Sequence, residues 1–121
     1  MDRKSPRPVE IHLHQVSRML DVSFDDGRSF SLPCEYLRVF SPSAEVRGHG
    51  PGQEVLQVGK RGVGIDAIEP IGMYAVKLAF TDGHDTGIYS WEYLYDLGER
   101  HDANWATYLK RLEQAGKSRD P

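Results

Sequence analysis

The chain has 121 residues, of which 39% are hydrophobic and 27% charged, so it can build one domain with a core but not two. Its formal net charge of −3 argues against a general nucleic-acid binder, because such proteins are normally basic. A single cysteine, Cys34, excludes an intramolecular disulfide and metal sites built from several cysteines. The lack of a long apolar run or a signal-peptide pattern predicts a cytoplasmic protein without a membrane partner.

The first forty residues predict an arm, three strands and a helix. Residues 1–9 are charged and contain proline, which predicts a disordered arm. Apolar and polar residues then alternate, as is typical of half-buried strands, and Asp26-Gly27 between two such runs predicts a hairpin turn. The expected strands lie at residues 10–14, 20–24 and 30–32, and the expected helix at residues 34–40.

The pattern breaks between Ser41 and Gly62. This stretch is rich in glycine, proline and serine, and residues 55–58 predict at most a brief helix or edge strand within it. A loop of this length in a small domain is usually functional or mobile. Cations gather in and beside it, which predicts weak binding of an anion or an acidic partner. These cations are Arg38, Arg47, Lys60 and Arg61.

Strand and helix patterns return in the second half. Ser90 is typical of a helix N-cap, and the helix that follows is expected to end at Gly98. A last helix is expected to be capped by Asp102 or Asn104. The remaining expected features are strands at residues 64–70, 74–80 and 86–89, a turn at Asp82-Gly83, the end of the last helix at Gly116 and a polar tail over residues 116–121.

A strand–turn–strand–helix unit occurs twice in the chain. The turn glycines Gly27 and Gly83 are 56 positions apart, and the leucines of two Glu-Tyr-Leu triplets, Leu37 and Leu94, are 57 apart. Duplication explains this spacing, and so does independent use of a simple local arrangement. Either origin predicts the α+β class: a small antiparallel sheet of two hairpin–helix units, with covering helices and a C-terminal helix.

Most catalytic motifs are missing. No Gly-x-Ser-x-Gly elbow occurs, and the glycines at positions 48, 50 and 52 are not followed by Gly-Lys-Ser/Thr, so neither a serine hydrolase nor an ATP-binding loop is indicated. Cys34 follows a proline at a predicted helix start, where a small core thiol is commoner than a reactive one. These observations favour a binding domain over an enzyme.

Two segments, residues 37–52 and 82–94, resemble the signature of a small family. They are similar to DUF971, a stand-alone bacterial domain that is itself similar to the N-terminal domain of γ-butyrobetaine hydroxylase. The resemblance covers roughly residues 10–115, which we expect to form the domain.

The resemblance implies a zinc site that this sequence does not preserve. In the hydroxylases, three cysteines of a Cys-Pro-Cys-x-x-Cys segment and one histidine bind a structural zinc. Those positions fall here on Ser41, Ser43, Val46 and His84, while the intervening Pro42 is kept. Hydroxyl groups are poor zinc ligands and valine is none, so we expect no metal and no other cofactor. Substitution of His84 should then change the melting temperature by only a few degrees.

The resemblance also implies what the chain does not do. The iron and 2-oxoglutarate sites of the hydroxylases lie in a separate C-terminal domain, so we expect a non-enzymatic interaction domain. Similar domains fused to iron–sulfur carrier ATPases imply a protein partner of that kind. The alternative is a metal-binding or iron–sulfur accessory protein that uses zinc or iron, with ligands from His84, His49 and either Cys34 or Glu45.

We expect one binding face, formed by residues 41–53 and 82–86, because the zinc site of the family joins these two segments. The candidate residues for partner or anion binding are Arg38, Ser41, Ser43, Arg47, His49, Lys60, Arg61 and His84.

Overall fold

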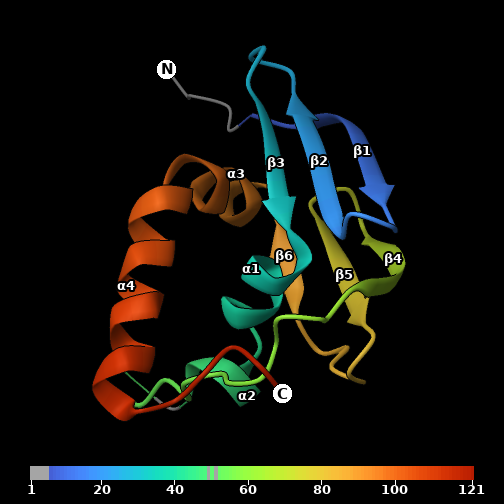
Figure 1. Ribbon diagram of the computed structural model, residues 1–121. Helices are drawn as coiled ribbons and strands as arrows, with labels where there is room; N and C mark the ends of the chain where they lie inside the picture. The colour runs from blue at the N-terminus through green and yellow to red at the C-terminus, as the bar shows by residue number, and fades with distance from the viewer. Residues whose placement is uncertain (1–5, 49, 51) are drawn as a thin grey trace.

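A computed structural model describes residues 6–48, 50 and 52–121. Within these residues the chain forms six strands and four helices (Figure 1). In chain order they are β1 (Pro8–His14), β2 (Met19–Phe24), β3 (Ser29–Pro33), α1 (Cys34–Val39), α2 (Ala44–Arg47), β4 (Ile65–Ile71), β5 (Ala75–Phe80), β6 (Ile88–Ser90), α3 (Trp91–Glu99) and α4 (His101–Ala115).

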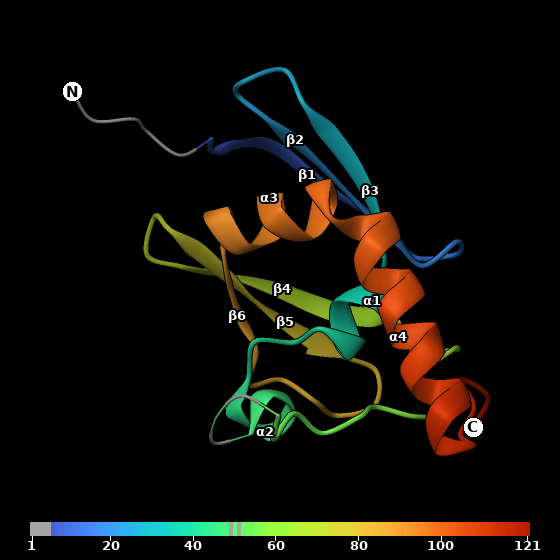
Figure 2. The same cartoon turned by 90° about the vertical axis from the view of Figure 1, so that its left-hand side faces the viewer.

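The strands form two antiparallel sheets of three, in the orders β1-β2-β3 and β4-β5-β6. Helices α3 and α4 lie on the same side of both sheets (Figures 1 and 2). The α+β class is therefore confirmed, with two sheets where one was expected. Strand β1 begins at Pro8, inside the segment expected to be a disordered arm, because Pro8 pairs with Phe24 and the backbone of Arg7 accepts a hydrogen bond from Asp25.

One core joins the two sheets. Alternate residues of β2 and β5 point inward, so Val22 and Leu78 are fully buried together with their neighbours two positions away. Burial of each such aliphatic side chain contributes about 1.5–3 kcal/mol to stability. Cys34 lies in this core, and burial raises the pKa of its thiol, as expected for a structural cysteine.

The two Asp-Gly turns have the same backbone hydrogen bonds. The amide of Phe24 donates to the carbonyl of Arg28 at 2.8 Å, and the amide of Phe80 donates to that of His84 at 2.9 Å. Gly27 and Gly83 have φ angles of 89° and 88°, a left-handed conformation that glycine adopts without strain. The repeat seen in the sequence is thus a repeat of structure.

Helices α1 and α3 exchange equivalent contacts. The Tyr36 hydroxyl donates to the carbonyl of Leu97 at 2.7 Å, and the Tyr93 hydroxyl donates to that of Phe40 at 2.5 Å. Tyr93 is 57 positions after Tyr36, and Leu97 is 57 after Phe40. Each bond is therefore the counterpart of the other under an approximate two-fold relation between the β1–α1 and β4–α3 units.

Helix ends differ from the sequence prediction at two places. Helix α3 continues through Gly98 to Glu99, and the glycine makes room for the ring of Phe30: a Cβ at this position would lie 2.4 Å from that ring. Helix α4 begins without a side-chain cap, so capping by Asp102 or Asn104 was a wrong prediction. Asn104 instead lies inside the helix and donates to the Tyr36 hydroxyl at 3.0 Å.

The last five residues dock onto the body of the domain. Backbone amides of Gly59 and Arg61 donate to carbonyls of Ser118 and Arg119, both at 3.0 Å. The Arg119 guanidinium binds both carboxylate oxygens of Glu35 in α1, at 2.6 and 2.7 Å, and its carbon lies 5.1 Å from the Trp105 ring centre. The polar tail therefore joins α1 to the end of the long loop.

Candidate functional site

The α1–α2 connection and the β5–β6 turn meet at two side-chain contacts. Ser41 Oγ lies 2.8 Å from Nε2 of His84, and Ser43 Oγ lies 2.7 Å from Oγ1 of Thr86. Ser43 also caps α2, since its side chain accepts a hydrogen bond from the amide of Glu45. The short helix α2 is thereby held against the turn.

His84 stands at the centre of a hydrogen-bonded chain. Nδ1 lies 3.0 Å from Oε1 of Glu45, and Nε2 faces Ser41, whose Oγ accepts from the amide of Ser43 at 3.2 Å. Burial lowers the pKa of His84, and the Arg38 guanidinium lowers it further against the opposing charges of Glu45 and Asp82. A neutral imidazole satisfies the whole chain: Nδ1–H donates to the carboxylate and the Ser41 hydroxyl donates to Nε2.

The order Glu45, His84, Ser41 matches the acid–base–nucleophile order of acyl-transfer enzymes. The serine, however, is only 1% exposed. Gly87 packs directly on it, because a Cβ at that glycine would lie 2.5 Å from Ser41 Oγ. With both the imidazole and an amide already on this oxygen, no space remains for a substrate carbonyl. In this arrangement the chain of bonds holds the α1–α2 connection against the β5–β6 turn.

Three of the expected binding cations are engaged within the domain. Arg38 Nε and Lys60 Nζ both bind Oδ2 of Asp82, at 2.8 and 2.7 Å, and Arg61 binds Asp120 in the tail. Burial alone would raise the pKa of Asp82, but the hydrogen bonds from Lys60 and Arg38 lower it to about 2. The contact of Arg38 has a counterpart in the other unit, where Tyr95, 57 positions later, donates to Asp26 at 2.6 Å.

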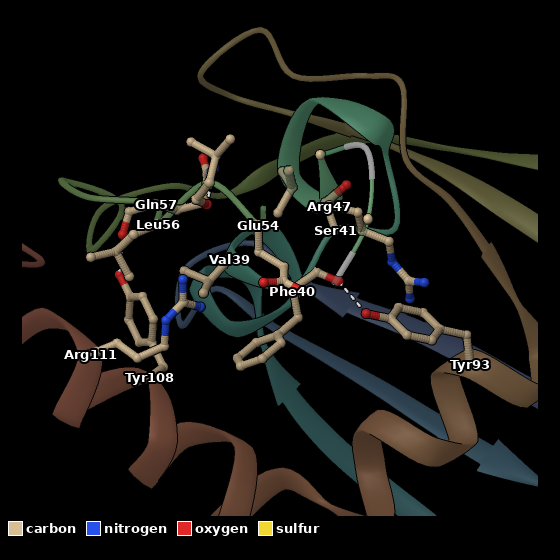
Figure 3. Close-up of a pocket in the computed structure, with 14 residues that line it drawn as sticks. Val39, Phe40, Ser41, Arg47, Glu54, Leu56, Gln57, Tyr93, Tyr108 and Arg111 are labelled. Atoms are coloured by element: carbon tan, nitrogen blue, oxygen red, sulfur yellow. Dashed lines mark hydrogen bonds between the residues drawn. The ribbon is translucent and has the colours of Figure 1, made fainter. Parts of the chain in front are cut away.

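A pocket of about 590 Å³ opens beside this cluster (Figure 3). It lies between the end of α1, helix α2, residues 54–57 and the facing sides of α3 and α4. Its apolar lining comes from both aliphatic and aromatic side chains. The main contributors are Val39, Phe40, Val46, Leu56, Tyr93 and Tyr108.

Two arginines stand at opposite ends of the pocket (Figure 3). The guanidinium carbon of Arg47 lies 5.0 Å from the ring centre of Tyr93 at one end, and Arg111 accompanies Tyr108 at the other. Neither arginine forms an ion pair with any carboxylate that the structure describes. Both arginines are exposed, and the hydroxyls of Tyr93 and Tyr108 donate to the backbone carbonyls of Phe40 and Gln57.

The family model for the gamma-butyrobetaine hydroxylase-like N-terminal domain matches residues 11–95. The chain belongs to this family. A DUF971 protein of unknown function from Acidithiobacillus ferrooxidans has a similar crystal structure, with 39% identity, a TM-score of 0.64 and coverage of 76% of this chain and 92% of that one. The match confirms the resemblance drawn from the two segments.

Two solution structures, each of a protein without a stated function, are also similar. One is 52% identical with a TM-score of 0.83 and covers 96% of this chain and 91% of its own. The other is 51% identical with a TM-score of 0.84 and covers 100% of this chain and 92% of its own. No functionally curated protein matches the chain.

The site of this DUF971 chain does not fit zinc. Ser41 and Ser43 supply hydroxyls that are already bonded, Val46 supplies methyl groups, and both ring nitrogens of His84 have partners. Among residues 6–48, 50 and 52–121, no group of three or more His, Cys, Asp or Glu side chains is placed to hold a metal ion. The hydrogen-bonded chain occupies the position that the resemblance assigns to the metal.

The structure sorts the predicted site residues into three groups. Ser41, Ser43 and His84 come together, Arg47 borders the pocket, and Arg38, Lys60 and Arg61 belong to internal ion pairs. His49 lies outside the described residues.

Sequence reasoning missed the part of the DUF971 pocket that α4 supplies. Arg111 lies one turn after Tyr108, a spacing that puts both side chains on one face of the helix. That spacing was visible, but only the buried position of Tyr108 shows which face meets the loop.

Over the stretches of chain described, no helix combines the length and apolar character needed to cross a membrane.

His84 should make stability depend on pH. Its pKa is lowered in the folded state, so the folded protein binds this proton less tightly than the unfolded chain. The contribution of His84 to stability is therefore fully present above pH 6.5, the ordinary pKa of histidine. It is lost as the pH falls from there through the lower pKa of the folded state. Urea unfolding of the wild type at about pH 7.5 and about pH 5.5 should show this loss.

The variant His84→Gln tests whether His84 causes this pH dependence of stability. Its free energy of unfolding should depend less on pH in this window, and an unchanged dependence would contradict the assignment. The variant should also lose about 1–3 kcal/mol at neutral pH, because Ser41 and Glu45 lose a buried partner. This expectation replaces the small effect predicted from the sequence, which considered only the metal.

Proposed function

We propose that this chain is a non-enzymatic binding domain that works without zinc, and that its ligand or partner segment enters the pocket between α1, α2, α3 and α4. One observation supports the proposal most directly: the pocket combines an apolar lining with two arginines that have no described carboxylate partner. A guanidinium group without a counterion beside an apolar cavity is typical of a recognition site.

The adjoining network supports the same proposal. Glu45, His84 and Ser41 fix the connection that leads into α2, and α2 carries Arg47 to the pocket. The hydrogen-bonded chain therefore acts as a support for the binding surface, which is a role compatible with the enclosed serine.

Binding can be tested without knowing the ligand. Isotope-labelled protein is mixed with the small-molecule fraction and, separately, with the protein fraction of an extract from the source cells. At least one fraction should move the backbone NMR signals of Val46 and Leu56, while Val16, 97% exposed on the β1–β2 hairpin, should not move. No selective change at the pocket with either fraction would contradict the proposal.

The absence of catalysis has its own test. A fluorophosphonate probe, which modifies activated serines, should leave the chain unlabelled because Ser41 is enclosed. Labelling of Ser41 that disappears in His84→Gln would show a working nucleophile and overturn the non-enzymatic part of the proposal.

A further inference from the structure

We propose that the ligand of this pocket is an elongated organic dianion, with an apolar body and a carboxylate or similar acidic group at each end. This inference rests on the proposed binding function and adds the chemical class of the ligand. It follows from the size of the pocket, the positions of its charges and the two arginines that have no described carboxylate partner.

Size and lining define the body of the ligand. A volume of about 590 Å³ lies within the range of small-molecule sites, which is roughly 300–1,000 Å³. Val39 and Phe40 from α1 and its C-cap, Val46 from α2 and Leu56 from the loop supply the apolar surface. Burial of hydrocarbon against them favours an aliphatic or aromatic chain over a sugar or polyol.

The guanidinium groups define the ends of the ligand. Arg47 is positioned by its contact with the Tyr93 ring, and Arg111 by the α4 turn that buries Tyr108. Their planar donor arrays match a carboxylate in a two-point contact. Because the two arginines lie at opposite ends of the pocket, a ligand with one acidic end satisfies only one of them (Figure 3).

Glu54 determines which charge the middle of the ligand can carry. Its side chain belongs to the lining and lies between the two ends in Figure 3. A negative charge in the centre of the ligand would meet this carboxylate and be repelled. The lining thus carries positive, negative and positive charge in that order, and an anion with its charges separated by an uncharged body is complementary to it.

A titration series tests the class directly. The full chain is titrated by calorimetry with straight-chain dicarboxylates of six to twelve carbons, with the matching monocarboxylates and with the dimethyl esters. The best dicarboxylate should bind about tenfold more tightly than the monocarboxylate of equal length, as expected for one added charge-assisted contact. The diester should bind more weakly than either.

Variants assign the two ends. Arg47→Gln and Arg111→Gln should each remove the advantage of the dicarboxylate over the monocarboxylate, and Glu54→Gln should tighten binding of both. Lys110→Gln is the matched control, because Lys110 is exposed on the same helix and does not line the pocket. NMR spectra of the free variants establish that each one is folded.

The outcomes separate this inference from the proposed function. Equal affinity for diester and dicarboxylate, or unchanged affinity in both arginine variants, overturns the dianion. If no dicarboxylate binds but an extract fraction still shifts the pocket signals, the dianion is wrong and the binding function stands. If neither produces a change, both are wrong.

Discussion

Replacing Ser41, Ser43 and Val46 together by cysteine is expected to create a zinc-binding chain. Ser41 already lies 2.8 Å from Nε2 of His84, and the amide of Val46 donates to the carbonyl of Ser43 at 3.0 Å, so Ser43 and Val46 lie one helical turn apart next to the serine that contacts the imidazole. Glu45 accepts from the other ring nitrogen, as carboxylates commonly do behind zinc-bound histidines. Thiolates would supply the ligands that the hydroxyls and the valine cannot.

The expected effect is large, since a structural zinc site contributes about 10–16 kcal/mol of binding free energy at neutral pH. After dialysis, mass spectrometry of metals should find close to stoichiometric zinc in the triple variant and none in the wild type. Cobalt should give the absorption of a tetrahedral thiolate site. The same variant with His84→Ala is the control and should hold the metal more weakly. A folded triple variant that stays free of zinc would show that these positions do not correspond to the zinc site.

Substitution of Arg119 by alanine should destabilise the domain by about 2–3 kcal/mol, because the Glu35 carboxylate would lose both hydrogen bonds from an arginine side chain that is itself 27% exposed. Glu35 is 7% exposed, and both of its carboxylate oxygens bind this arginine. The variant also loses the packing of the guanidinium group on Trp105. Urea unfolding of the wild type and the variant at neutral pH measures the difference.

Two further variants make the result specific. Arg61→Ala removes an exposed pair with Asp120 in the same tail and should cost less than about 1 kcal/mol. Glu35→Gln added to Arg119→Ala should recover part of the lost stability, because no buried charge is then left unpaired. If Arg119→Ala and Arg61→Ala prove equally mild, the tail does not stabilise the core.

The fold could be predicted where local patterns determine structure. The two Asp-Gly turns and the Ser90 cap depend on short-range geometry, and each lies where the sequence places it. The predicted end of α3 at Gly98 was wrong by one residue. This glycine makes room for the ring of Phe30, whose approach no local pattern reveals. The docked tail was not predicted either, because Arg119 binds Glu35, a residue 84 positions away in the sequence.

The candidate site was predictable in part. The resemblance placed Ser41 and His84 in one cluster, and the structure has them in contact. The list of binding cations was too long because composition cannot distinguish a free cation from one that is paired: Arg38 and Lys60 share Asp82, which is distant in sequence from both. The pocket itself depends on where α4 packs, and a chain pattern does not contain that information.

The exchanged contacts between α1 and α3 suggest how such a chain could arise. The Tyr36 hydroxyl of the first unit donates to a carbonyl of the second, and the Tyr93 hydroxyl of the second donates to a carbonyl of the first. Each unit therefore needs the other for these hydrogen bonds. A single ancestral unit would have found the same partners in a second copy of itself, as a symmetric homodimer. Fusion of two such copies would need a linker, and residues 41–62 stand at that place in the chain. A linker occurs once, so the pocket formed along it lies where the symmetry between the two units is broken.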